Sequence, residues 1–188
     1  PPQDGEDTAT YSRRIINGAF EQVSDAADLG TRIHAGIETA FKEGISAVSE
    51  DVYHYVKLVK QDLEFAGIKI VQHELRLVNE FDGYAGTTDA VMVKDGKQGI
   101  LDFKSRTTKP GVKIEPWETE PMQIAAYYVA KFGRIPPYGA IGANVYISTT
   151  EPGRVQIVTY DDVQLEQAWE AFKAANSLWQ YLKGYRPK

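Results

Sequence analysis

The sequence predicts an α/β fold with about five strands between helical segments. Apolar residues recur at helical spacing through the N-terminal third of the chain. Strand-type residues dominate 68–105 around an Asp95-Gly96 turn, and a helix, a strand pair and a final helix follow. No repeat, low-complexity tract or linker divides the sequence, so we expect one domain over 11–188 after a flexible N-terminus at 1–10.

Composition excludes several classes of protein. The 188 residues are 43% hydrophobic and 25% charged, which is enough for a sizeable core. The formal net charge of −5 argues against a protein that coats duplex DNA. The absence of cysteine excludes an iron–sulfur cluster and a cysteine nucleophile. No apolar run approaches the roughly 20 residues of a membrane span, so no membrane partner is expected.

These features predict a cytoplasmic protein, either bacterial or a phage protein in its host. The chain begins with Pro-Pro and shows no secretory signal. An organellar location is the alternative if a targeting segment has been trimmed away.

Three helices are expected before the first strand. A weak apolar pattern predicts one over 11–23, and Asp28 is expected to cap a second. The second helix carries an apolar stripe at every fourth residue, formed by Leu29, Ile33, Ile37 and Phe41. Ser49 is expected to cap a third helix that ends near Gly67.

The middle of the chain predicts an antiparallel meander. Strand composition covers 68–79, 84–93 and 98–105, and the Asp95-Gly96 turn joins the last two of these segments tightly. A basic loop with proline and glycine follows over 107–116.

The C-terminal third predicts two helices around a strand pair. The first helix starts near Glu120 and ends at Gly133, and strands are expected over 138–149 and 153–160. Asp161 opens the last helix with a capping box. One face of that helix is expected to pack through Leu165, Trp169, Phe172, Trp179 and Leu182.

The strand over 98–105 combines burial with charge. It is apolar on both faces, which is typical of a central strand, yet Asp102 and Lys104 project to the same side of it. Burying two charges is costly without compensation. A buried structural ion pair or a strand end that reaches solvent would explain this pattern simply, and a functional pair is the other explanation.

A second carboxylate is expected beside Asp102. The tight hairpin places Asp89 within one position of the residue opposite Asp102. Two adjacent carboxylates repel each other unless one is protonated or a cation lies between them. Oxygen ligands without thiols suit Mg²⁺ or Mn²⁺. An isolated turn or edge aspartate remains the alternative for Asp89.

These motifs resemble those of the PD-(D/E)XK nucleases. The segment 86–89 (GTTD) and the segment 102–104 (DFK) match the family's G-x-x-D and (D/E)-x-K motifs. The RecB-like branch, which includes the RecB and AddB nuclease domains and the mitochondrial genome-maintenance exonuclease, is indicated by three more matches. These are the histidine in 30–34 (GTRIH), the strand glutamate Glu74 and the Q-x-x-x-Y motif in 123–127.

The resemblance implies a fold and a set of roles. The fold would be a restriction-endonuclease-like core, in which helices flank a central mixed β-sheet of about five strands after an N-terminal helical segment. The implied catalytic residues are Asp89, Asp102, Lys104, Glu74 and Gln123. The implied metal ligands are His34, Asp89, Asp102 and the carbonyl of Phe103. The implied nucleic-acid contacts are Tyr127, Arg106, Lys109 and Gln123.

Several of these residues also have simpler explanations. His34 lies beside an apolar helix position, and the alternative to a metal ligand is an ordinary helix histidine. Glu74 lies on a polar strand face, where solvent exposure alone would explain it. Gln123 and Tyr127 are one helical turn apart and could simply flank a core stripe. His54 and His73 have no motif context and are expected to be surface or packing residues.

The expected function is hydrolysis of DNA phosphodiesters with Mg²⁺ or Mn²⁺. By resemblance, the protein acts as an exonuclease on single strands or DNA ends in replication, recombination or repair, with a protein partner of unknown identity. A structure-specific or restriction-type endonuclease and an inactive nucleic-acid-binding module are the alternatives. One group of basic residues stands out in this acidic chain and is expected to bind phosphates. It comprises Arg106, Lys109, Lys113, Lys94 and Lys97.

Overall fold

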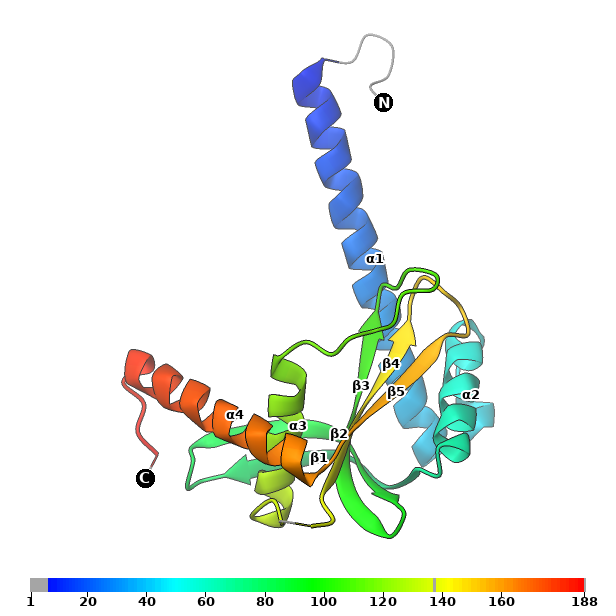
Figure 1. The fold of residues 1–188 in the computed structure, drawn as a ribbon. Coiled ribbons are helices and arrows are strands. Elements are labelled where there is room, and N and C mark those ends of the chain that lie inside the picture. Colours follow the sequence, from blue (N-terminus) through cyan, green and yellow to red (C-terminus); the bar gives the residue numbers. More distant parts are fainter. Residues whose placement is uncertain (1–6, 137, 188) are drawn as a thin grey trace.

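The computed structural model describes residues 7–136 and 138–187, and a five-stranded sheet with helices on both faces organises it (Figure 1). The helices are α1 (Thr8–Lys42), α2 (Glu50–Phe65), α3 (Thr119–Phe132) and α4 (Asp162–Lys183), with a short 3₁₀ turn at Ile45–Ala47. The strands are β1 (Lys69–Asn79), β2 (Tyr84–Lys94), β3 (Lys97–Arg106), β4 (Ile141–Ser148) and β5 (Val155–Tyr160).

The sheet is mixed, and β3 lies at its centre. The spatial order is β1-β2-β3-β4-β5, with antiparallel pairs except for the parallel pair β3–β4. Helix α3 forms the crossover that makes this parallel pairing possible. The predicted α/β class, five-stranded mixed sheet, flanking helices and N-terminal helical segment are therefore confirmed.

Helix α1 corrects the prediction for the N-terminal region. Two helices were expected over 11–41, with Asp28 as a cap, but one continuous helix runs from Thr8 to Lys42. The helix already begins within the expected flexible N-terminus, because the Asp7 side chain accepts a hydrogen bond from the N–H of Thr10. The segment 21–28 contains no proline or glycine, so nothing in it ends a helix. The prediction for 1–6 lies outside the described residues.

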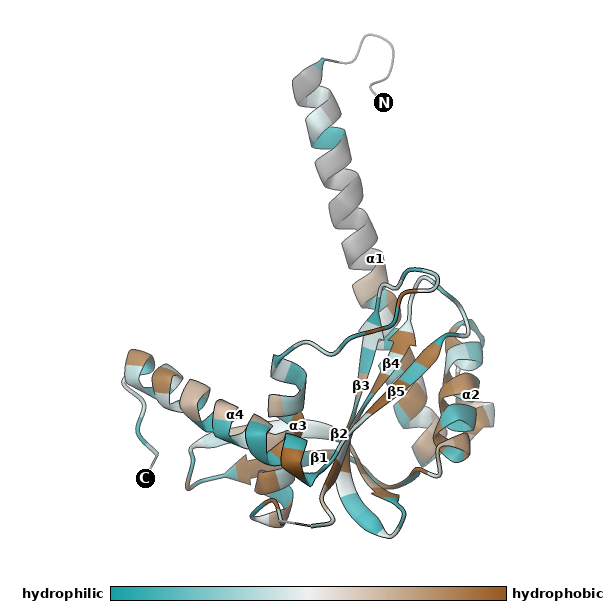
Figure 2. Cartoon of the chain, viewed as in Figure 1, coloured by the Kyte–Doolittle hydropathy of each residue, from teal (hydrophilic) through white to brown (hydrophobic). Residues whose placement is uncertain are grey.

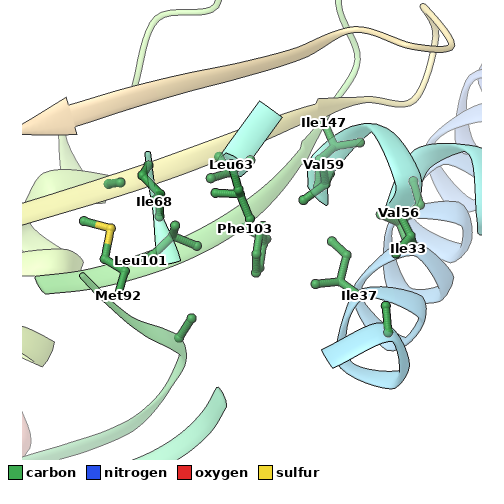
Figure 3. Close-up of a cluster of buried hydrophobic side chains, with 14 of the residues drawn as sticks. Ile33, Ile37, Val56, Val59, Leu63, Ile68, Met92, Leu101, Phe103 and Ile147 are labelled. Atoms are coloured by element: carbon green, nitrogen blue, oxygen red, sulfur yellow. The ribbon is translucent and has the colours of Figure 1, made fainter. Parts of the chain in front are cut away.

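Two cores cover the two faces of the sheet. Helices α1 and α2 pack on one face through a cluster that includes Ile33, Val56, Leu101 and Phe103 (Figure 3). Helices α3 and α4 pack on the other face through a cluster that includes Ile100, Ile124, Leu165 and Trp169. Since β3 contributes side chains to both clusters, its burial follows directly from its central place.

Gly30 allows α1 to approach β3 closely. A Cβ atom at this position would lie 2.3 Å from the Oγ of Ser105, so any larger residue would push the helix away from the strand. The close contact holds His34, one helical turn later, over the same strand. The glycine of the G-T-R-I-H motif thus has a packing explanation.

Helix α4 is only partly covered. Its predicted capping box at Asp161 and Gln164 is confirmed, and Leu165 and Trp169 are buried. Trp179 and Leu182, which were expected to pack on the same apolar face, are 50% and 69% exposed. Figure 1 shows the reason: the C-terminal half of α4 extends past the sheet, and Figure 2 shows that this half carries apolar residues. In the part of the chain that the structure describes, no helix is long and apolar enough to cross a membrane.

Candidate nuclease site

Asp89 and Asp102 lie side by side, as the hairpin register predicts. Ala90 pairs with Leu101, and each aspartate is the next residue beyond that pair on its own strand. The N–H of Phe103 donates a 2.7 Å hydrogen bond to Asp89 Oδ2. This hydrogen bond ties the Asp89 carboxylate to the backbone of β3 where the two strands separate.

Lys104 links Asp102 to helix α3. Its Nζ lies 2.7 Å from Asp102 Oδ2, and it donates a 2.8 Å hydrogen bond to Gln123 Oε1. Gln123 Nε2 donates in turn to the hydroxyl of Tyr127 at 3.2 Å. The structure therefore brings Asp102, Lys104, Gln123 and Tyr127 into one connected chain of polar contacts.

Asp102 remains incompletely satisfied in this chain of contacts. The residue is only 4% exposed, and its buried Oδ2 atom has the Lys104 ammonium 2.7 Å away but no hydrogen bond of good geometry. A buried carboxylate oxygen that is only partly compensated is costly. It is an atom with spare capacity to bind a cation or a water.

Gly86 of the G-x-x-D segment makes room for Tyr127. A Cβ atom on Gly86 would lie 2.6 Å from Cε1 and 2.9 Å from the hydroxyl of that tyrosine. Helix α3 can therefore place Tyr127 against β2 only because residue 86 lacks a side chain. The contact with Tyr127 at Gly86 and the Asp89 carboxylate therefore lie three residues apart on the same strand, β2.

The electrostatics of the site favour a bound cation. Burial raises the pKa of Asp89 to about 7, and the charge of Asp102 adds to the increase. Burial also raises the pKa of Asp102, although Lys104 opposes this change. Both shifts mean that two negative charges are poorly tolerated together, and a dication would stabilise both ionised forms.

His34 contributes a neutral imidazole beside the carboxylates. Its Nδ1 lies 3.9 Å from Asp89 Oδ2, and its ring meets Phe103 edge-on at 6.4 Å between centroids. Burial lowers the pKa of His34, and Asp102 only partly offsets that effect. A neutral imidazole is the form that binds a metal ion.

Glu74 and His73 also reach this region. A small cavity of about 30 Å³ is lined by His34, Ile37, Glu38, Phe41, His73, Glu74, Asp89, Ala90 and Phe103. Glu74 has a φ of 48°, a strained conformation for a residue other than glycine, which is often found at functional sites. The Nδ1 atom of His73 is buried without a hydrogen-bond partner. His73 was expected to be a surface or packing residue, and its ring packs on Phe41 with the ring centroids 5.2 Å apart.

Arg106, which was expected to contact a phosphate, has a partner within the protein. Its guanidinium group forms a buried ion pair with Glu120 and lies 3.7 Å from the ring centre of Trp117. Glu120 also accepts hydrogen bonds from the Tyr146 hydroxyl at 2.7 Å and from the N–H of Trp117 at 2.8 Å. Because Glu120 lies one turn before Gln123, this network fixes the start of α3 and positions Gln123 toward Lys104.

A second buried polar contact supports Asp102 from the neighbouring strand. Asn144 pairs with Asp102 across β3 and β4, and its Nδ2 lies 3.5 Å from the Asp102 carbonyl. The Tyr160 hydroxyl donates to Asn144 Oδ1 at 2.9 Å, and burial raises the pKa of Tyr160 to about 12. Sequence reasoning missed Asn144, Tyr146, Tyr160 and Glu120, because their partners are remote in the chain.

The predicted basic concentration is divided in the structure. Lys94 and Lys97 lie at the β2–β3 turn, whereas Arg106 ends β3, about 30 Å away at the usual strand rise. Lys113 forms an exposed pair with Glu115 at 3.1 Å. Lys109 is exposed in the loop after β3, and its carbonyl accepts from Arg154 at 2.9 Å. Lys109 is thus exposed in a loop that packs on the β4–β5 turn.

The donor set fits Mg²⁺ or Mn²⁺ in its chemistry. Two crowded carboxylates, the orphaned Asp102 oxygen and a neutral imidazole are suitable hard or borderline ligands. Within 7–136 and 138–187, no group of three or more His, Asp or Glu side chains is already arranged around a common metal position. Binding would therefore require rotation of these side chains.

The sequence matches no protein-family model, and it matches no curated protein. Among solved structures, the chain is similar to the crystal structure of SSO0001, with a TM-score of 0.37 and 19% sequence identity. The match covers 87% of this chain and 68% of that chain. A likeness this distant carries no argument about function.

Proposed function

We propose that this protein is a metal-dependent nuclease that hydrolyses DNA phosphodiester bonds. The observation that carries the proposal is the convergence of Asp89, Asp102 and Lys104 on the central strand pair, with one buried Asp102 oxygen that only the Lys104 ammonium contacts. The resemblance of the same residues to the PD-(D/E)XK motifs, RecB-like branch, adds to this support.

The ligands proposed for Mg²⁺ or Mn²⁺ are Asp89, Asp102, His34 and the Phe103 carbonyl. When bound, such a cation neutralises charge on the phosphate and makes water a stronger nucleophile. Glu74, which lines the cavity with His34 and Asp89, is the further carboxylate that would accept a hydrogen bond from that water.

Lys104 is the residue proposed to act on the attacking water and on the phosphate group. The Lys104 ammonium group donates a hydrogen bond to Gln123 Oε1 and forms an ion pair with Asp102. These two contacts fix its position. From there it would orient the attacking water and stabilise negative charge on the phosphate oxygens. Tyr127 restrains Gln123 from the other side.

An exonuclease that acts on single strands or DNA ends is the favoured form of this activity. The chain is acidic overall, and the lysines and arginine expected to hold phosphates are spread between the β2–β3 turn and the loop after β3. Few phosphate contacts suit a strand that enters at its end better than a duplex held along its side. Roles in replication, recombination or repair are part of the same proposal.

The deciding experiment compares end-labelled single-stranded, duplex and circular DNA, each incubated with Mg²⁺ or Mn²⁺. We expect the linear single strand to be degraded and the circular DNA to stay intact. Cleavage of the circle would replace the exonuclease by an endonuclease. Absence of cleavage on every substrate with either metal would contradict the proposed activity.

Calorimetric titration with Mn²⁺ tests the ligand set separately from activity. Binding should weaken strongly in Asp89→Asn and Asp102→Asn and less in His34→Ala. Asp95→Asn is the matched control, since Asp95 is an exposed aspartate at the β2–β3 turn, away from the site. Unchanged binding in both carboxylate variants would remove the proposed metal site.

A further inference from the structure

A large groove adjoins the proposed nuclease site. It has a volume of about 1040 Å³ and lies between α3, α4, the connected ends of β1 and β2, and the C-terminal tail. Gln123 and Tyr127 line it. Because Gln123 also accepts the hydrogen bond of Lys104, the groove begins where the proposed reaction centre ends.

Aromatic rings form the walls of the groove. Trp179 and Tyr185 are 50% and 44% exposed, with ring centroids 5.9 Å apart. Phe172 lies deeper, with its ring 4.9 Å from that of Tyr84. The exposed rings offer apolar flat faces, and such faces are suited to stacking against planar ligands.

Hydrogen bonds hold the walls in place. The side chains of Asn176 and Gln180 on α4 both donate to the carbonyl of Asp82, at 2.7 Å and 2.8 Å. The Tyr84 hydroxyl donates to the carbonyl of Ala126 on α3 at 2.8 Å. The groove is therefore preformed, so a ligand does not have to order it first.

The charge of the groove is balanced. Among the described lining residues, Glu80 and Arg186 supply one charge of each sign. A phosphate backbone gains little net attraction from such a surface, whereas planar uncharged groups gain from the aromatic walls. The faces of paired bases are covered by their neighbours in a duplex, so only unpaired bases present them.

We propose that this groove binds the unpaired bases of a nucleic-acid strand by stacking on Trp179 and Tyr185, while a phosphate of the same strand lies at Lys104. The proposal rests on the proposed nuclease function and adds a substrate preference, namely single-stranded over duplex ends. Affinity would come mainly from bases, and sequence preference would be weak because every base has a stacking face.

The test measures binding of wild-type protein in EDTA by fluorescence anisotropy. The probes are a labelled single strand of mixed sequence, a strand of equal length made of abasic deoxyribose phosphates, and a blunt duplex. We expect the mixed strand to bind at least about tenfold more tightly than either of the others, since each stacked base contributes that order of affinity. Trp179→Ala should lose about tenfold on the mixed strand and almost nothing on the abasic strand.

Tyr181→Ala is the matched control for this experiment. Tyr181 is an aromatic residue on the same helix, 83% exposed and absent from the groove wall, so its replacement should leave binding unchanged. Equal affinity for the mixed and abasic strands, or equal losses in both variants, would overturn the base-binding groove. DNA cleavage by the same preparation is scored separately. Cleavage without base-dependent binding refutes the groove alone, and base-dependent binding without cleavage refutes the nuclease function alone.

Discussion

Strand β3 carries two buried ion pairs that differ in how completely they are satisfied. Asp102–Lys104 and Glu120–Arg106 have similar side-chain exposure, 6% and 22% against 5% and 16%. Both Glu120 oxygens have hydrogen-bond donors, from Arg106, from the Tyr146 hydroxyl and from the backbone of Trp117. The Oδ2 atom of Asp102 has only the Lys104 ammonium 2.7 Å away, outside hydrogen-bond geometry, and the Nε atom of Arg106 is buried without an acceptor. Burial is thus similar, and the two pairs differ at the carboxylate, since both oxygens of Glu120 accept hydrogen bonds and Asp102 Oδ2 does not.

This difference indicates two roles. A buried pair whose carboxylate is fully hydrogen-bonded fixes its surroundings, here the start of α3 against β3 and β4. A buried pair with an open oxygen, a second carboxylate beside it and raised carboxyl pKa values is poised for a ligand.

The largest expected effect is the loss of catalysis when the Asp102–Lys104 pair is broken. Lys104→Ala should lower kcat by about 10²- to 10⁴-fold, the usual contribution of a positioned proton-transfer group. The thermal midpoint should change little, because burial raises the pKa of Asp102 and loss of the Lys104 charge, which opposes that increase, disfavours an unpaired negative charge still further. Cleavage of labelled DNA and thermal unfolding measure the two effects. Lys97→Ala, an exposed lysine at the other end of β3, is the control, and full activity of Lys104→Ala would refute the mechanism.

The Arg106–Glu120 pair should matter more for stability than for catalysis. Arg106→Ala leaves Glu120 buried without its cation and should reduce the free energy of unfolding by about 3 kcal/mol. Urea denaturation measures this loss. Lys113→Ala breaks the exposed pair with Glu115 and should cost less than about 0.5 kcal/mol. Similar losses in the two variants would mean that the Arg106 pair does not anchor α3.

A smaller effect is expected where α3 meets β2. Gly86→Ala would place a Cβ atom 2.6 Å from the Tyr127 ring and should cost about 1–3 kcal/mol of unfolding free energy by overpacking. Combining it with Tyr127→Ala should remove that penalty, because the clashing ring is gone. A double variant whose loss equals the sum of the single losses would show that the clash is not the cause.

The smallest effect concerns pH. With a folded pKa of about 7 against an ordinary 3.8, Asp89 binds more protons in the folded state between these values, so stability falls as pH rises through that window. In EDTA, the wild type should lose about 1 kcal/mol more than Asp89→Asn between about pH 5 and about pH 6. Urea denaturation at both pH values measures it. Parallel pH profiles for the two proteins would contradict the raised pKa.

Local pattern was enough to predict the strands and the pairing of the two aspartates. The Asp95-Gly96 turn fixes the register of β2 on β3, and the alternation of side chains along a strand then places Asp102 and Lys104 together. Helix ends at Ser49, Asp161 and Gly133 were likewise predictable, because capping depends on neighbours in sequence. The length of α1 was not, since a polar stretch without proline or glycine neither continues nor ends a helix unambiguously.

Local sequence was enough to place Asp102 and Lys104 on one strand, Asp89 across the hairpin from Asp102, and Gln123 one helical turn from Tyr127. The meeting of Gln123 with Lys104, the pairing of Arg106 with Glu120, and the place of Trp179 in a groove instead of a core depend on the tertiary structure. These contacts depend on how far each helix is displaced and rotated on the sheet. That placement follows from packing across the parallel β3–β4 crossover and from close approaches at Gly30 and Gly86, which no local propensity encodes.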